Sequence, residues 1–304
     1  MKRIALMLLA LFAAAGVATT ANPQELTGTL KKIKDTGVVT IGHRDASIPF
    51  SYYDDKQQPV GFSMDLCARI ADAVKNELKM PKLEVKYQLV TSANRIPLMA
   101  NGTIDLECGS TTNNVERQKQ VSFAITHFLT ANRYVTKKAS NIKSIEDLKG
   151  KTVVSTSGTT NIKQATDLNV AKNMGMNIIP ANGHPEAFQM VETGRAVAFV
   201  MDDILLYTLV AQARTPGDYV ISSDALSLPE PYGIMLRKDD PAFKKVVDNA
   251  MIQTYKSGEI FKIYDKWFTK PVPPKGINYD VPMSPLFKNL VANPTDSGDP
   301  TVYK

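Results

Sequence analysis

The sequence predicts an α/β protein built from two lobes that follow one another along the chain. Its 304 residues are long enough for about two domains, and a content of 43% hydrophobic and 22% charged residues is typical of a chain that buries a sizeable core. Two series of alternating strand and helix patterns run through it, one in each half. We therefore expect neither a disordered chain nor a membrane protein.

The N-terminus has the pattern of a secretory signal peptide, which we predict over residues 1–21. Two basic residues precede an apolar run from Ile4 to about Val17, and small residues follow it. The run is shorter than the roughly 18 to 20 residues of a membrane-spanning helix. We therefore expect export and a mature chain that begins at Asn22. No lipid anchor is expected, because the first cysteine is Cys67.

The first series of elements predicts a mostly parallel sheet. An amphipathic helix ends at Gly37 and is followed by a short apolar strand, residues 38–42. Residues 61–80 then place apolar side chains at helical spacing, and residues 83–90 alternate like a strand. Residues 94–109 add a short helix, a glycine turn and another strand. This order is β-α-β, which is typical of parallel strands.

The second series repeats this alternation. A short helix ends at Gly150, a strand follows from Val153, and "SGTT" opens another helix; residues 176–203 add strand, loop, helix and strand. A long amphipathic helix pattern, residues 243–267, has no strand of its own and must pack on one of the lobes. We expect the proline-rich tail after it to lie on the surface as a strap, and the sequence leaves open whether its end is ordered.

Charge and histidine spacing exclude two classes of function. The formal charge of +6 falls to +4 when the two basic residues of the leader are removed, and the remaining basic residues are scattered among acidic ones, which argues against nucleic-acid binding. His43, His127 and His184 lie far apart and lack the spacing of metal ligands. We therefore expect no metal and no cofactor.

The two cysteines, Cys67 and Cys108, allow two arrangements. In an oxidising compartment they could form a disulfide that closes a loop of about 40 residues and stabilises the fold by about 3 to 4 kcal/mol. The alternative is two buried thiols in one core. The sequence alone leaves both open, because the Cα separation decides between them.

Four loops are expected at the ligand-binding edge, because ligands of open α/β sheets bind beyond the carboxyl ends of the strands, near helix N-termini. They read "GHR", "TSANR" and "GSTTNNVER" in the first half and "TSGTT" in the second. Arg44, Arg95 and Arg117 are the only arginines in these loops, and hydroxyl residues accompany each of them. The planar fork of arginine matches a carboxylate, so three of them favour a ligand with more than one carboxylate.

Asp202 and Asp203 end a strand of the second half, and a carboxylate there could bind an ammonium group. Two carboxylates and one ammonium describe an acidic amino acid. Each feature also has a purely structural alternative: Asn113 with Glu116 forms a capping box, the arginines would be solvated, and the aspartates would cap the next helix. The coincidence of all these groups at strand ends favours the ligand.

Several short motifs are shared with one known family: "VGFSMDLC", "ECGSTTNNVERQ", "DLKGKTVV", "SGTT", "ETGRAVAFVMDD", "YGIMLRKDDPAFKK" and "GEIFKIYDKWF". On these motifs the chain resembles the extracytoplasmic amino-acid-binding proteins of ABC importers, the family 3 extracellular solute-binding proteins, and most closely those that bind glutamate and aspartate. The resemblance runs from about Leu30 to Phe268. Each motif alone is modest, but together they are highly specific.

The resemblance implies the two-lobe periplasmic binding protein fold of type II, with two hinge strands and the ligand in the cleft between the lobes. The hinges would lie near "NRYVTKK" and "EPYGIML". Residues 22–134 and 230–304 would form lobe 1, to which the terminal helix returns, and residues 135–229 lobe 2. Met235 stands where close relatives often carry a cysteine, which leaves Cys67 to pair with Cys108.

The resemblance also implies a role for each site residue. The α-carboxylate of the ligand would be held by Arg117, Ser110, Thr112 and the backbone at Thr160. The α-ammonium would be held by Asp202. The side-chain carboxylate would be surrounded by Arg44, Ser92, Arg95 and His184. Three arginines against one aspartate give this set a charge of +2 before an acidic ligand binds.

The implied function is that of a periplasmic receptor, a monomer, which captures L-glutamate or L-aspartate and delivers it to the membrane permease of an ABC importer without catalysing a reaction. One alternative is a dehydratase-like enzyme on the same scaffold. Others are a binding protein for another polar amino acid such as glutamine, or a sensor that acts through a membrane receptor. The sequence leaves glutamate and aspartate undecided, because one methylene is worth only about 1 to 3 kcal/mol.

Overall fold

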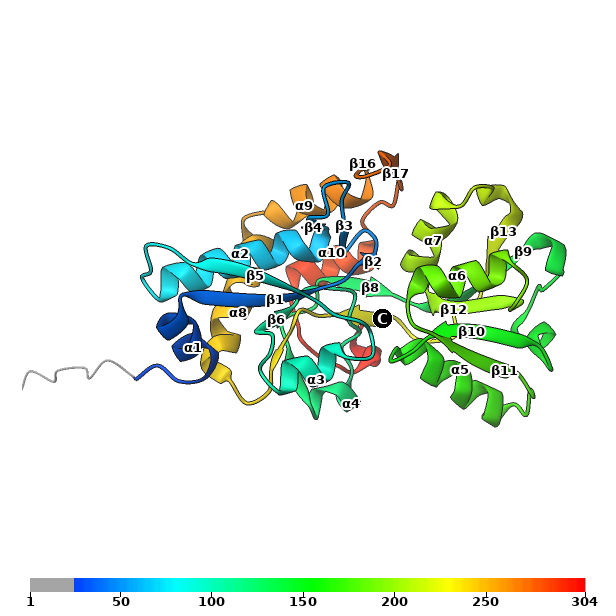
Figure 1. Ribbon diagram of the computed structural model, residues 1–304, viewed down its shortest axis with the longest axis horizontal. Helices are drawn as coiled ribbons and strands as arrows, with labels where there is room; N and C mark the ends of the chain where they lie inside the picture. The colour runs from blue at the N-terminus through cyan, green and yellow to red at the C-terminus, as the bar shows by residue number, and fades with distance from the viewer. Residues whose placement is uncertain (1–24, 304) are drawn as a thin grey trace, which may run out of the picture.

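A computed structural model shows two α/β lobes side by side along the long axis of the molecule (Figure 1). It describes residues 25–303, so the signal peptide predicted over residues 1–21 lies outside the described residues. Across residues 25–303 no helix is both long and apolar enough to cross a membrane. The predicted α/β fold of two lobes is confirmed.

Lobe 1 is the part built around a five-stranded sheet of order β5-β1-β6-β15-β7. Strand β1 runs parallel to β5 and β6, whereas β15 is antiparallel to β6 and β7, so the sheet is mostly parallel as predicted. Its strands are β1 (Val38–His43), β5 (Glu84–Leu89), β6 (Leu106–Glu107), β7 (Val121–Phe123) and β15 (Met235–Arg237). Two small antiparallel sheets flank it, formed by β2 (Ala46–Ser47), β3 (Ser51–Tyr53) and β4 (Pro59–Val60), and by β16 (Pro271–Val272) and β17 (Ile277–Asn278).

The helices of lobe 1 come from both ends of the described chain. They are α1 (Gly28–Thr36), α2 (Phe62–Glu77), α3 (Arg95–Ala100), α4 (Val115–Gln118), α8 (Pro241–Lys256), α9 (Glu259–Phe268), α10 (Pro285–Ala292) and the 3-10 turn η4 (Pro300–Val302). The prediction of one long helix over residues 243–267 is wrong. Gly258 adopts a left-handed φ of 75° between α8 and α9, which a glycine tolerates and a helix does not.

Lobe 2 is built around a second five-stranded sheet, of order β11-β10-β12-β9-β13. Its strands are β9 (Asn132–Lys137), β10 (Thr152–Thr156), β11 (Asn177–Ala181), β12 (Ala198–Asp202) and β13 (Tyr219–Ile221). Its helices are α5 (Thr160–Ala171), α6 (His184–Glu192) and α7 (Asp203–Gln212), with the 3-10 turns η1 (Lys138–Ser140), η2 (Ile145–Leu148) and η3 (Pro216–Asp218). Helix α5 covers one face of the sheet, and α6 and α7 cover the other (Figure 1).

Two strands run between the lobes and pair with each other in antiparallel fashion: β8 (Phe128–Thr130) and β14 (Glu230–Tyr232) (Figure 1). The chain passes from β8 into β9 of lobe 2 and returns through β14 into β15 of lobe 1. The residue limits of the lobes stay a prediction; the first of them, after residue 134, falls inside β9.

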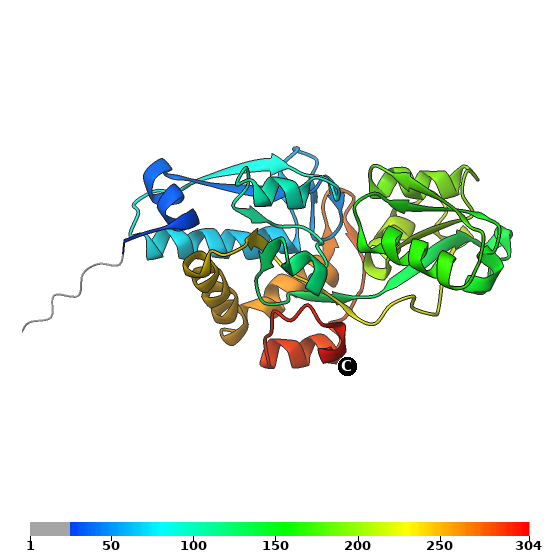
Figure 2. The same ribbon diagram turned by 90° about the horizontal axis from the view of Figure 1, so that it is seen from below.

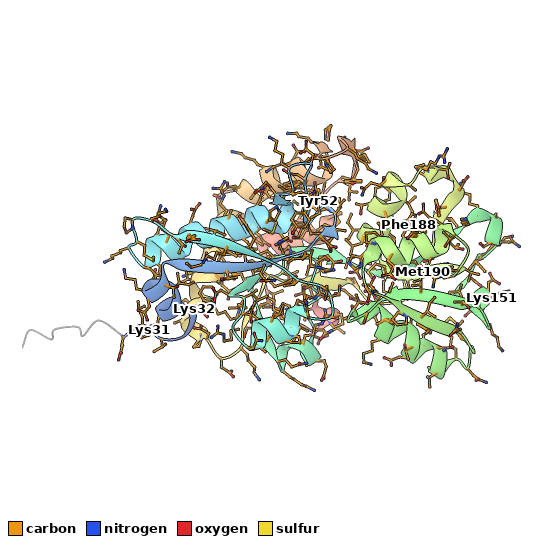
Figure 3. All side chains as sticks on the ribbon, in the orientation of Figure 1. Lys31, Lys32, Tyr52, Lys151, Phe188 and Met190 are labelled. Atoms are coloured by element: carbon orange, nitrogen blue, oxygen red, sulfur yellow. A yellow bond between two sulfur atoms is a disulfide. The ribbon has the colours of Figure 1, made fainter. Side chains whose placement is uncertain are left out.

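An aromatic cluster lies where these strands meet lobe 1. Phe50 stacks edge to face on Phe128 and Tyr232, with ring centroids 4.8 and 5.1 Å apart, and Phe268 of α9 packs on Phe128 at 5.2 Å. Such pairs add specific geometry to the burial of large apolar surfaces. Figure 3 shows the buried Phe188 inside lobe 2, and charged side chains such as Lys151 at the outer surface.

A disulfide joins Cys67 of α2 to Cys108, with their Cα atoms 6.3 Å apart. Both residues are fully buried. Of the two arrangements that the sequence left open, the structure contains the disulfide. It fixes the start of the loop after β6, which carries several of the predicted site residues, to a long helix of the core.

The C-terminal tail lies along lobe 1, where Figure 2 shows it on the lower edge of the molecule. Tyr303 is buried, and its hydroxyl lies 2.8 Å from that of Thr126. The backbone carbonyl of Asp296 accepts a hydrogen bond from the Asn113 side chain at 2.8 Å. The strap is therefore ordered up to Tyr303 and reaches the loop that precedes α4.

Candidate ligand-binding site

The predicted site residues gather between the two lobes, around a small cavity of about 10 Å³. Seven of the nine line it: Ser92, Arg95, Ser110, Thr112, Thr160, His184 and Asp202. Arg44 and Arg117 adjoin this lining, Arg44 close enough to Arg95 for their charges to interact and Arg117 in contact with Thr112. Loops at strand ends of both sheets thus meet at one place, as expected for an α/β fold.

At one end of the cavity two buried guanidinium groups are held by the surrounding chain. Arg44 Nε donates to the Val90 carbonyl at 3.1 Å, and Arg95 Nη1 donates to Thr111 Oγ1 at 2.5 Å. Each arginine keeps one buried nitrogen without a partner, Nη1 of Arg44 and Nε of Arg95. Burial, and next the charge of Arg95, lowers the pKa of Arg44 to about 10, so it remains a cation at neutral pH.

Ser92 and His184 face the same end with unpartnered atoms, Ser92 Oγ and His184 Nε2. His184 Nδ1 lies 2.9 Å from the hydroxyl of Thr156. Burial, and then the charges of Arg44 and Arg95, lowers the pKa of His184 well below its usual value, so the ring is neutral. When the Thr156 hydroxyl donates to Nδ1, the ring proton lies on Nε2, which becomes a donor.

Four residues at or beside the cavity therefore each have one buried polar atom without a partner among residues 25–303: Arg44, Ser92 and Arg95 of lobe 1 and His184 of lobe 2. Buried polar groups in folded proteins nearly always have a hydrogen-bond partner, and leaving one unpaired costs about 1 to 3 kcal/mol. Two cations, a hydroxyl and, with the ring proton on Nε2, a neutral imidazole donor suit an anion. A carboxylate can accept from several donors at once.

The residues predicted to hold the α-carboxylate are organised by Arg117. Its backbone N–H is capped by Asn114 Oδ1 at 2.8 Å, so Asn114 is the N-cap of α4. The predicted capping box of Asn113 and Glu116 is wrong, because the Asn113 side chain turns to the C-terminal tail instead. Arg117 Nη1 donates to the Thr112 carbonyl at 2.8 Å and Nη2 to the Gly158 carbonyl of lobe 2 at 3.2 Å.

The electrostatics of Arg117 follow from its burial. Burial, and next the charge of Arg95, lowers its pKa to about 9, while the carboxylates of Glu230 and Asp202 act in the opposite direction. The guanidinium is therefore still charged at neutral pH. A buried cation that spans both lobes can bind an anion in the closed arrangement.

Asp202 and Asp203 have different partners, although they are adjacent. Asp203 Oδ1 accepts from the Ile204 N–H and from the Thr130 hydroxyl, both at 2.7 Å, so it holds the start of α7. Asp202 makes no side-chain cap bond; it accepts from Asn161 Nδ2 at 2.8 Å and from the Tyr232 hydroxyl. Burial, and next the charge of Glu230, raises the pKa of Asp202 to about 7. A cation beside this carboxylate would favour its ionised form.

Two buried glutamates belong to the site and were missed from the sequence. Glu107 Oε2 accepts from Thr111 Oγ1 at 2.5 Å, and Glu107 Oε1 lies 3.9 Å from Arg95 Nη1. Glu230 Oε2 accepts from Thr112 and Thr160. With all carboxylates ionised, three arginines face three acids, so the expected charge of +2 before binding is wrong. Glu107 lies inside a shared motif and Glu230 in the stretch expected to form a hinge, but no spacing rule points either of them at the cavity.

The two lobes touch directly beside the cavity. A Cβ atom at Gly158, whose φ is +75°, would lie 2.5 Å from the Cα of Ala93 and 2.7 Å from the Ser92 carbonyl. Only glycine fits this backbone-to-backbone contact. Within residues 25–303, no group of three or more acidic, histidine or cysteine side chains could hold a metal ion.

Known proteins resemble this chain over most of its length. Residues 39–270 match the family described as bacterial extracellular solute-binding proteins, family 3. The chain is 58% identical over 273 residues to the L-glutamate/L-aspartate-binding protein of Pseudomonas aeruginosa, covering 90% of both chains. It is 48% identical over 297 residues to the glutamate/aspartate import solute-binding protein of Escherichia coli, covering 97% of this chain and 98% of the relative.

Solved structures of amino-acid-binding proteins also align with this chain. A mutant of ArgBP from T. maritima aligns with a TM-score of 0.68 and 32% identity over 78% of this chain and 98% of that chain. An ancestral amino acid-binding protein described as a precursor of cyclohexadienyl dehydratase aligns with a TM-score of 0.67 and 31% identity, over 79% of this chain and 99% of that chain. The fold is the type II periplasmic binding protein fold, and the chain belongs to the bacterial extracellular solute-binding proteins of family 3.

Proposed function

We propose that this protein is a periplasmic receptor that captures L-glutamate or L-aspartate between its lobes and hands it to the permease of an ABC importer. The observation that carries the proposal is the set of four unpartnered buried atoms of Arg44, Ser92, Arg95 and His184. They form a site for a second carboxylate, which a neutral amino acid lacks. The names of the relatives from P. aeruginosa and E. coli support the same ligand class.

The ligand would bridge the lobes through its three charged groups. Its side-chain carboxylate would lie among the four unpartnered atoms, its α-carboxylate beside Arg117, Ser110, Thr112 and the backbone of Thr160, and its ammonium at Asp202. Arg95 and Arg117 belong to lobe 1, whereas His184 and Asp202 belong to lobe 2. Since only the closed arrangement presents both sets, binding would select it.

Discrimination against glutamine follows from charge. An amide in place of the side-chain carboxylate would leave the guanidinium groups of Arg44 and Arg95 buried without the counter-charge of the ligand. Removing one partner of a buried ion pair costs about 3 to 5 kcal/mol. We therefore expect glutamine to bind weaker than glutamate by several orders of magnitude.

The chain would be exported by the signal peptide over residues 1–21, would act as a monomer without a lipid anchor or cofactor, and would catalyse nothing. The alternatives are a receptor for glutamine and a dehydratase-like enzyme, and the experiment below includes a measurement for each.

The proposal is tested by isothermal titration calorimetry on the mature chain from Asn22, unfolded and refolded to remove any bound ligand. We expect saturable binding of glutamate and aspartate with a Kd of about 1 μM or tighter, near −8 kcal/mol, and much weaker binding of glutamine and arginine. Heat from glutamine or arginine alone would contradict the role of Arg44 and Arg95. No binding of any of them, together with turnover of prephenate, would favour the enzyme.

A further inference from the structure

Strand β14 places two side chains against residues that line the cavity. Glu230 and Tyr232 are two residues apart in a strand, so they lie on the same face. The Tyr232 hydroxyl donates to Asp202, and Glu230, only 5% exposed, receives donors from both lobes. The strand is also bonded to the site loop, because the Asn113 N–H donates to the Pro231 carbonyl at 2.8 Å.

Glu230 binds one hydroxyl from each lobe on the same oxygen. Thr112 Oγ1 of lobe 1 and Thr160 Oγ1 of lobe 2 both donate to Glu230 Oε2 at 3.2 Å, and the two hydroxyl oxygens are 3.5 Å apart. Gln164 Nε2 donates to the other oxygen, Oε1. Among residues 25–303 this carboxylate forms no salt bridge with a lysine or arginine, so its hydrogen-bond donors are two hydroxyls and one amide.

A chain of side-chain amides connects Glu230 to Asp202 and fixes the direction of each hydrogen bond. The Asp202 carboxylate only accepts, so Asn161 presents its NH₂ group to it, at 2.8 Å. The same NH₂ donates to Asn132 Oδ1 at 3.0 Å, so Asn132 presents its own NH₂ to Gln164 Oε1 at 2.6 Å. Because Gln164 Oε1 accepts from Asn132, Gln164 presents its NH₂ group to the side chain of residue 230. The network therefore requires an acceptor there.

The state of the two threonines follows from this network. A hydroxyl has one hydrogen, and because the Glu230 carboxylate can only accept, the contacts at 3.2 Å take it from both Thr112 and Thr160 in preference to the longer contact of 3.5 Å between the two hydroxyls. Toward the cavity they can then only accept a hydrogen bond. An acceptor suits the ammonium group of a ligand and not its α-carboxylate. Asp202, which interacts electrostatically with Glu230, lines the same cavity.

We propose that Glu230 determines the specificity for the α-ammonium group, by holding the hydroxyls of Thr112 and Thr160 as acceptors beside Asp202. The inference rests on the proposed function and changes one detail of it: the hydroxyl of Thr112 binds the ammonium, while Arg117 and the backbone N–H groups hold the α-carboxylate. Glu230 is a positioning residue, because it acts on the ligand through the two threonines.

The substitution Glu230→Gln tests this role, because the direction of the amide chain dictates its result. Gln164 still needs an acceptor, so the new amide turns its oxygen to Gln164 and its NH₂ to the two threonines. Both hydroxyls then accept from that NH₂ and turn their hydrogens toward the ligand. The two hydroxyls at the ammonium site thus become donors instead of acceptors, while the shape of the site is kept.

The measurement is calorimetric titration of the mature chain with L-glutamate and with glutarate, which has both carboxylates and no ammonium. For Glu230→Gln we expect glutamate affinity to fall at least about tenfold, since the charged ammonium group loses its hydrogen-bond acceptors, and glutarate affinity to stay within about threefold of the wild type. Glu192→Gln is the matched control. Its carboxylate accepts from Tyr219 at the end of α6 opposite to His184, and both affinities should stay as in the wild type.

A second variant, Thr112→Val, removes one hydroxyl at nearly constant volume and keeps the test independent of whether Glu230→Gln folds. It too should weaken glutamate selectively. Equal losses for glutamate and glutarate in either variant would show a structural role, or a hydroxyl that serves a carboxylate, and would overturn the inference; so would an unchanged glutamate affinity. A wild-type chain that binds no acidic amino acid would instead overturn the proposed function, and this inference with it.

Discussion

The two ends of the ligand site differ in whether their buried polar groups already have partners. At the side-chain end, four residues each leave one buried atom unpaired: Arg44, Ser92, Arg95 and His184. At the α-amino end, the side chains of Asp202 and Glu230 all accept hydrogen bonds from neighbours. The first end is therefore unfavourable without a ligand, whereas the second is a satisfied network.

Because of this difference, we expect the two ends to contribute differently to ligand recognition. A carboxylate at the unpaired end supplies hydrogen bonds that the ligand-free fold lacks, so we expect most of the binding free energy to come from there. At the paired end the ligand must replace hydrogen bonds that already exist, so little net free energy of binding is gained there. That end instead sets which group is accepted.

The largest effect is expected for Arg95→Ala at the unpaired end. The ligand would lose a buried counter-charge, so its affinity should fall by about 3 to 5 kcal/mol, while the fold persists. Calorimetry with glutamate and aspartate measures it. Arg69→Ala is the control, because Arg69 is exposed and pairs with Glu259 on the surface of lobe 1. Unchanged affinity in Arg95→Ala would refute the role given to this arginine.

The ligand meets both ends of the site only when the lobes are closed, and Gly158→Ala should prevent this closure. The added Cβ would meet the backbone of Ala93, and the left-handed φ of +75° adds strain of about 1 kcal/mol. We expect glutamate to bind roughly 10 to 100 times more weakly, about 1.4 to 2.7 kcal/mol. Small-angle scattering with saturating glutamate should show a more extended particle than the wild type. A wild-type affinity would mean that the lobes do not meet here.

The pH dependence of affinity examines the paired end. Burial and Glu230 raise the pKa of Asp202 to about 7 in the ligand-free protein, and the ammonium of a ligand would favour the ionised carboxylate. Below about pH 7 binding must therefore expel a proton, so affinity should fall as the pH is lowered, by up to about tenfold per unit.

His184 does not contribute to this profile, because its lowered pKa keeps it neutral throughout. Asp202→Asn should bind weakly at every pH and show a flat profile between pH 5 and about 8. In the ligand-free chain it should also be more stable than the wild type near pH 8, because a carboxyl group whose pKa is raised by folding opposes folding once it ionises. Chemical denaturation at pH 8 measures this; a less stable variant would contradict the assignment.

The smallest effect is expected for Ser92→Ala. Affinity for glutamate should fall by about 1 kcal/mol, one hydrogen bond, whereas the stability of the ligand-free chain should not fall, because the Ser92 hydroxyl has no partner to lose. Thr112→Val at the paired end should lower that stability, since Glu230 loses a donor. Equal changes in stability for the two variants would remove the contrast between the ends.

The unpaired end could be predicted from the sequence, because its arginines and serine follow strands whose carboxyl ends meet at one sheet edge. Loop composition and the resemblance were enough to name Arg44, Ser92 and Arg95, and they named His184 from the second lobe. The alternation of strands and helices likewise gave both sheets. These features depend on local patterns that a chain carries in short segments.

The paired end could not be predicted in full, because it depends on contacts distant in sequence. Glu230 meets Thr112 only because β14 pairs with β8 and with the site loop, 118 residues away in the chain. The amide chain from Asn161 to Gln164 needs β9 and α5 in their folded positions. The capping by Asn114 was missed because the neighbouring Asn113 offered an equally good local pattern.

The most direct test of the account is a crystal structure of the protein with L-glutamate. We expect the side-chain carboxylate to lie within about 2.7 to 3.2 Å of the four atoms that lack partners here: Arg44 Nη1, Ser92 Oγ, Arg95 Nε and His184 Nε2. The ammonium should contact Asp202 and the Thr112 hydroxyl. A complex in which those four atoms remain unpaired, or in which they hold the α-carboxylate, would contradict the account.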